Sequence, residues 1–272
     1  MADIRAKYQL HVEKILTLAG NKNAADTAKL IVELETELAK VQWSAVEIRD
    51  PVKGYNKLAI TQLASLTPGY DWSTYLKAGD VRGKTTYLNV SQPSYLTGFN
   101  EVLNKTPLSV WKSYLEWQVL NSFSPYLSHA FVDEVFAFRG TVLTGAKENM
   151  TREKRGVALT DRMLGESIGK SYVEKYFPAE RKARTETMVK NFLTAFKESI
   201  DLLDWMSPET KKEAQIKLSK ISVKVGYPNK WRDYSTLTIA NDDLVGNLIR
   251  ARQARYQLEA NKLGKPIDRE EW

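Results

Sequence analysis

Two histidines and no cysteine leave this chain with few side chains that could bind a transition metal. His11 is followed by Val12 and His129 by Ala130, so neither begins an H-E-x-x-H pattern. In that pattern two histidines bind zinc and the glutamate acts as general base. A tetrahedral zinc site with nitrogen and sulfur ligands therefore cannot be assembled from this chain alone. We name no catalytic, cofactor-binding or metal-binding residue, and we interpret both histidines as structural.

The stretch from Gly140 to Lys147 comes close to a phosphate-binding loop. Such a loop needs a lysine directly after its second glycine and a Ser or Thr next to it, which binds the metal ion of the nucleotide. Here Ala146 displaces the lysine by one position, and no Ser or Thr follows Lys147. We therefore reject a nucleotide-binding site.

The clusters of charged residues fit solvated surfaces. Glu33, Glu35 and Glu37 are spaced by two, which scatters them around a helix, and we expect all three in water. The net charge of +7 and a pI near 9.3 raise nucleic-acid binding as an alternative. Basic residues gather at 181–184 and 250–255, but acidic residues are interleaved and no nucleic-acid motif accompanies them. We therefore predict no nucleic-acid partner.

Composition predicts a folded, globular chain. Its 272 residues are 43% hydrophobic, which is ample for a hydrophobic core. The absence of cysteine excludes disulfides. No run approaches the roughly 20 apolar residues that span a membrane, and the first residues do not read as an export signal. If the intact protein is exported, its signal lies outside this chain.

The spacing of apolar residues predicts a mainly α, multi-helix fold with one or two short strands. One strand is expected within Tyr87–Val90, and the segment from Arg139 to Met150 is expected to be a loop. A helix beginning near Pro107 is apolar on most sides, which places it in the middle of the fold. The other main helices are expected over about residues 3–19, 24–42, 58–65, 71–77, 151–177, 178–204, 208–220 and 242–263.

The clearest local pattern lies between Leu202 and Pro228. Ser207 is a favourable helix N-cap, and Pro208 occupies the first helical position, where its missing N–H costs nothing. The alternating apolar run 221–225 predicts a short strand, which Gly226 closes.

The expected helix 151–177, capped by Thr151, contains Gly165 and Gly169. A glycine inside a helix costs about 1 kcal/mol relative to alanine. We therefore expect another element to pack closely against that face of the helix.

Several of these residues resemble the neprilysin-like zinc metallopeptidases of family M13, and within it the bacterial, PepO-like branch. In the family a Trp-Met pair, a helix opening Glu-Thr-Lys-Lys and a Gly-Tyr-Pro recur, as they do here at 205–206, 209–212 and 226–228. One departure is Thr160-Asp161-Arg162, where relatives commonly carry Val-Asn-Gly. Further matches follow in the family's order, at residues 49–51, 138–140, 143–145, 164–166, 172–177, 242–247 and 264–272.

The resemblance implies a two-lobed enzyme in which a helical lobe covers a zinc lobe and encloses a chamber for peptides. Residues 1–272 resemble mainly that N-terminal helical lid, and the family's zinc-binding motif lies beyond the position of Trp272. We expect the intact protein to bind zinc and cleave peptides. We expect the chain alone to bind no stoichiometric zinc, to cleave no peptide and to need the zinc catalytic domain as its partner.

Two other classes stay open at this point. A stand-alone helical binding module would expose an apolar face that a partner covers. A basic nucleic-acid-binding protein would bind oligonucleotides with a steep dependence on salt. The residues do not decide the compartment, although the bacterial resemblance is compatible with a periplasmic or secreted protein.

Overall fold

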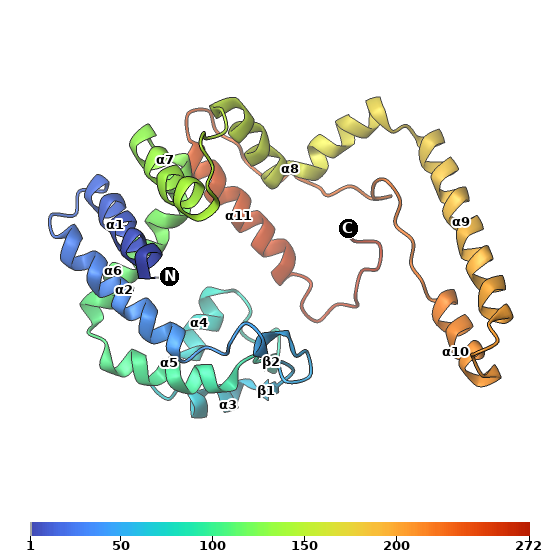
Figure 1. The fold of residues 1–272 in the computed structure, drawn as a ribbon, viewed down its shortest axis with the longest axis horizontal. Helices are drawn as coiled ribbons and strands as arrows, with labels where there is room; N and C mark the ends of the chain where they lie inside the picture. Colours follow the sequence, from blue (N-terminus) through green and yellow to red (C-terminus); the bar gives the residue numbers. More distant parts are fainter. Residues whose placement is uncertain (1) are drawn as a thin grey trace. The chain divides into compact units, whose positions relative to one another are not determined.

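The chain forms eleven α-helices and one two-stranded sheet in the computed structural model, which describes residues 2–272 (Figure 1). This confirms the mainly α class with short strands. The helices belong to two compact units. Unit 1 comprises residues 2–150 together with Ile239–Lys265, and unit 2 comprises Thr151–Thr238 together with Pro266–Trp272.

Unit 1 is a helical assembly with one small sheet. Its strands β1, Lys57–Ala59, and β2, Tyr87–Asn89, pair antiparallel with Leu58 opposite Leu88. The strand predicted near Tyr87 is therefore confirmed, whereas β1 was not anticipated. The helices are α1 Ala2–Leu18, α2 Ala24–Lys40, α3 Ile60–Leu66, α4 Trp72–Ala78, α5 Pro93–Lys105, α6 Leu108–Phe123, α7 His129–Val135 and α11 Leu244–Ala260.

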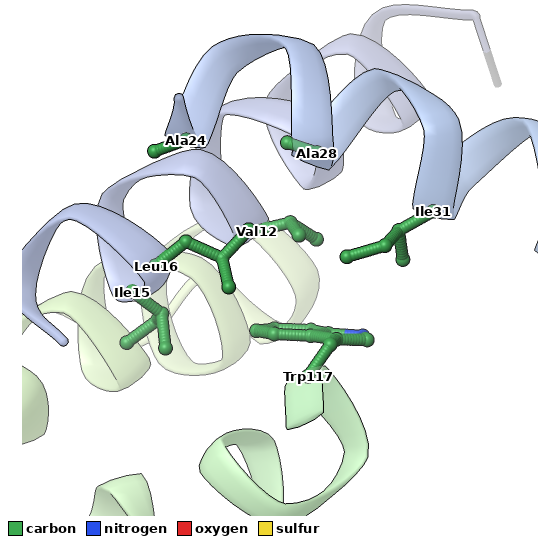
Figure 2. Packing of buried hydrophobic residues seen from close by; sticks show 7 residues of the cluster. All are labelled: Val12, Ile15, Leu16, Ala24, Ala28, Ile31 and Trp117. Carbon is green, nitrogen blue, oxygen red and sulfur yellow. The ribbon is translucent and has the colours of Figure 1, made fainter. Parts of the chain in front are cut away.

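The main core of unit 1 lies where α1, α2 and α6 meet (Figure 2). The indole of Trp117 on α6 is fully buried and lies beneath the apolar side chains of the other two helices. Those side chains recur at helical spacing, which is why each helix turns one face inward. The cluster consists of Val12, Ile15, Leu16, Ala24, Ala28, Ile31 and Trp117.

Helix α6 is less central than its sequence predicts. Trp117 is its only fully buried residue, whereas Leu108, Leu115 and Val119 are exposed. The helix packs against α1 and α2 on one side, and no element of unit 1 covers the side that carries these three residues. The prediction that it lies in the middle of the fold was therefore wrong for its outer face.

The predicted loop from Arg139 to Met150 is also partly helical. After α7 the chain continues as a π-helix, Phe136–Val142, and keeps helical hydrogen bonding to Thr144. The ring of Phe136 lies against Gly140, where a side chain would collide with it. π-Helical segments are rare and occur mostly as bulges within α-helices, and this one likewise has helical residues on both sides.

Unit 2 consists of three helices and connecting segments, α8 Arg152–Tyr176, α9 Ala179–Leu202 and α10 Pro208–Ser219. Both predicted N-caps are confirmed: the Thr151 hydroxyl accepts from the N–H of Lys154, and the Ser207 hydroxyl from the N–H of Thr210. Helix α8 is kinked at Leu164, whose backbone angles leave the helical region, so the predicted helix is two helical segments.

The two glycines of α8 have different surroundings. A side chain at Gly169 would meet the ring of Trp231 at 3.5 Å, which confirms the predicted close packing at that position. A side chain at Gly165 would meet only the Asp161 carboxylate of the same helix, so the prediction of close packing by another element was wrong there. Gly165 instead follows the kinked residue Leu164, where a flexible backbone favours the bend.

The predicted strand at 221–225 does not form. The sheet of β1 and β2 lies in unit 1, and no strand is found among the residues that unit 2 contributes. A strand needs a neighbour to pair with. An alternating sequence pattern cannot supply that neighbour.

We predict that Leu16→Ala lowers the free energy of unfolding of unit 1 by about 2–5 kcal/mol, because it leaves a cavity in the fully buried cluster. Leu115→Ala is the matched control. Its side chain is 61% exposed, and we expect a loss below about 1 kcal/mol. Urea denaturation of both variants measures the difference, and equal losses would contradict the assigned core.

Candidate functional site

His11 lies inside unit 1, where it is only 2% exposed. Its Nδ1–H donates to Glu134 Oε1 at 3.0 Å, and the other oxygen of Glu134 pairs with Lys14 Nζ at 3.1 Å. The imidazole stacks on the ring of Phe138 with centroids 4.8 Å apart. The structural interpretation of His11 agrees with this burial, because a substrate could not reach the ring.

The protonation state of His11 follows from the same contacts. Burial lowers the pKa of His11, and the positive charges of Arg139 and Lys14 lower it further, although Glu134 opposes them. The ring is therefore neutral at neutral pH. Its Nε2 is buried without a hydrogen-bond partner among residues 2–272.

A second polar group joins the three core helices of unit 1. The Trp117 N–H donates to the Tyr8 hydroxyl at 3.3 Å, and that hydroxyl donates to Glu35 Oε1 at 3.1 Å. Burial raises the pKa of the Glu35 carboxyl, and burial together with the Glu35 charge raises the pKa of Tyr8. Glu35 is thus a partner of the core, and the prediction that it lies in water was wrong. Glu33 and Glu37 are exposed as predicted.

These groups do not form a metal centre. No group of three or more His, Cys, Asp or Glu side chains in the described residues could hold a metal ion. His129 is exposed at the start of α7, whereas His11 is buried on α1.

Across residues 2–272 no helix is both long and apolar enough for a membrane span.

Several of the clustered basic side chains have partners within their own unit. Lys182 Nζ donates to the Tyr227 carbonyl at 2.8 Å, and Arg250 pairs with Asp243 at 3.0 Å. The guanidinium of Arg252 lies over the ring of Phe123, 4.7 Å from its centroid. These contacts fit structural roles better than phosphate binding.

Unit 2 presents a groove of about 490 Å³ between α8 and the segment that follows α10. Tyr227 and Trp231 stack with their ring centroids 5.7 Å apart on one side. On the other, Glu166 accepts from the main-chain N–H of Arg232 at 2.7 Å and pairs with its side chain at 3.3 Å. Five of its eleven lining residues are aromatic, and the lining has no set of groups arranged for acid–base or nucleophilic chemistry.

Apolar side chains also remain exposed on α9. Met188, Phe192 and Phe196 follow one another at intervals of four residues, and each is at least 49% exposed. Their spacing places them on one face of the helix. None of α8, α9 and α10 has a fully buried residue. This apolar surface is suited to contact with another protein surface.

A model of peptidase family M13 matches residues 1–228. Over its whole length the chain is 40% identical to the zinc metalloprotease Zmp1 of Mycobacterium tuberculosis in an open state, with a TM-score of 0.92. It is 28% identical over 99% of its length to an endothelin-converting enzyme homolog of Locusta migratoria, and 27% identical over 100% to a neutral endopeptidase of Lactobacillus helveticus.

The chain spans only part of each of these proteins. It covers 43% of the Mycobacterium tuberculosis protein, 40% of the Locusta migratoria protein and 42% of the Lactobacillus helveticus protein. The matches therefore describe about two fifths of the length of these relatives.

We predict that His11 makes unit 1 less stable in mild acid. Its pKa is lower in the folded than in the unfolded state, so the unfolded chain binds more protons as the pH falls through about 6.5. Stability that is present above that pH is then lost. Denaturation of wild type and His11→Gln at about pH 8 and about pH 5.5 should show a smaller loss in the variant.

His129→Gln is the control, since this exposed residue should leave the wild-type loss unchanged. Acidic groups that do not contact His11, including Glu35, are common to all three proteins, and their contribution cancels in the comparison. The same loss in His11→Gln as in wild type would contradict the role of His11.

Proposed function

The chain belongs to peptidase family M13, and from this membership we propose that it is a helical part of a zinc metallopeptidase that cleaves peptides. One observation carries the proposal: the whole chain matches a zinc metalloprotease at 40% identity and a TM-score of 0.92. Agreement in both sequence and fold over every element supports a shared role in the intact enzyme.

We propose that the zinc-binding residues lie on a part of the family protein outside this chain. The residues present do not fit a zinc site, because His11 is buried against Glu134 with its ring between aromatic side chains, and no other suitable cluster is found in residues 2–272. A catalytic zinc needs three protein ligands and an open position for water. Those ligands would come from the part of the family protein outside this chain.

In this proposal the helices contribute to peptide hydrolysis by selecting substrates by size. In this proposal residues 1–272 form the helical lobe that covers the substrate chamber, admits peptides and excludes folded proteins. The packed core around Trp117 supports this role, because a wall that selects by size must be rigid. The exposed face of α9 supports the need for a partner, because apolar side chains grouped on one exposed face are typical of a protein-contact site.

A stand-alone binding module would use the same exposed face, but neither the family match nor the similarity to a zinc metalloprotease favours it. The partners of the basic residues likewise do not favour nucleic-acid binding.

We expect the chain alone to hold no stoichiometric zinc and to cleave no peptide. Adding the remainder of the Mycobacterium tuberculosis enzyme, the part outside the span matched here, should restore chelator-sensitive cleavage of a quenched fluorescent peptide. Elemental analysis and fluorescence measure the two quantities, with the remainder alone as control.

Two outcomes would contradict the proposal in different ways. About one zinc per chain together with cleavage by the chain alone would place a catalytic site within it. No gain in cleavage over the remainder alone would contradict its role as a part of the enzyme.

A further inference from the structure

The segment Ile221–Val225 of unit 2 has the sequence of a strand but no partner. Ile221, Val223 and Val225 alternate with polar residues, which is the period of a strand with one apolar face. Among the described residues, the main-chain N–H groups of 222–225 donate no hydrogen bond. Figure 1 shows this stretch leaving α10 as a trace without helix or strand.

The apolar side chains of this segment are open to contact. Ile221 is 51% and Val223 is 43% exposed, and both are β-branched residues, which favour strands. The Val225 carbonyl accepts from the N–H of Tyr227 at 2.8 Å, and the Lys224 side chain donates to the Glu271 carbonyl. The unpaired N–H groups of 222–225 beside such side chains remain a template on which another strand can add. The segment thus combines the main-chain and the side-chain requirements of strand addition.

Both ends of the segment are held in place. Before it, Gln215 on α10 donates to the Lys197 carbonyl and to the Asp201 carboxylate of α9, each at 2.8 Å. After it, Gly226 adopts a φ of +70° and Tyr227 stacks on Trp231. A segment fixed at both ends loses less conformational entropy when it pairs than a free tail would.

The groove beside the segment indicates the chemistry of its partner. It holds about 550 Å³ between α9 and α10 and reaches Ile221. Its lining combines apolar side chains, among them Ile216 and Leu218, with three lysines. A complementary surface would place apolar residues against these apolar side chains and carboxylates near the lysines, which are Lys190, Lys197 and Lys212.

We propose that Ile221–Val225 pairs, as a β-strand, with a sheet edge on the part of the M13 protein outside this chain. The inference rests on the proposed function. That part is the chosen partner because the chain matches a zinc metalloprotease along its whole length yet covers only 43% of it. The partner strand would lie beside residues 222–225, and its neighbouring side chains would enter the groove that these lysines line.

Proline substitutions test the pairing directly, because proline removes the main-chain N–H that a ladder requires. Alternate N–H groups of a strand point to opposite edges, so Ser222→Pro and Val223→Pro sample both. Val223→Thr is the matched control, since it keeps the N–H and the β-branched shape. Each chain is titrated with the remainder of the Mycobacterium tuberculosis enzyme by calorimetry, and peptide cleavage is recorded in parallel.

We expect at least one proline variant to bind about tenfold or more weakly, and Val223→Thr to stay within about threefold of wild type. Binding of both proline variants within about threefold of wild type, with cleavage restored, would overturn the strand and leave the proposed function standing. Absence of both binding and restored cleavage with the wild-type chain would overturn the proposed function and the strand together.

Discussion

The burial of one tryptophan is the interaction on which unit 1 depends. Trp117 brings a large apolar ring into the space between α1 and α2, and this contact fixes how the three helices pack. A buried indole N–H needs an acceptor, and the Tyr8 hydroxyl supplies it. Tyr8 in turn donates to Glu35, so the apolar contact and the hydrogen bonds select the same arrangement of helices.

The same core extends to α7 and the π-helix. His11 contacts the edge of Trp117, stacks on Phe138 and pairs with Glu134. Protonation would strengthen the pair with Glu134, but burial disfavours the charged imidazole more strongly, so acid destabilises this part of the core. The only buried histidine therefore links the packing of unit 1 to pH without any catalytic role.

Unit 2 is built in the opposite way. Its helices bury no residue fully, and the spacing that would normally face a core instead presents Met188, Phe192 and Phe196 to the outside. Its local structure is nevertheless well specified by the caps at Thr151 and Ser207 and by the stacking around Trp231. A unit with defined helices and little interior gains most of its further stability from a surface that covers it.

The sequence predicts best what neighbouring residues decide. Helix starts at Ser207 and Thr151 follow from hydroxyls placed before the first turn, and both formed as expected. Glu35 was mispredicted because its partner Tyr8 lies 27 positions away, and the pairing of His11 with Glu134 spans 123 positions. The sequence shows directly that its histidines lack the spacing of the H-E-x-x-H motif. It does not show that one side of α6 is exposed, because apolar residues alone do not indicate which side of a helix another element covers.

Hydrogen exchange tests most directly whether this chain is one part of a larger M13 enzyme. In the chain alone, we expect slow exchange in α1, α2 and α6 and faster exchange in α8, α9 and α10. Adding the remainder of the Mycobacterium tuberculosis enzyme should slow exchange in α8, α9 and α10 and leave the Trp117 core little changed. Slow exchange throughout the isolated chain, with no change on addition, would contradict the account.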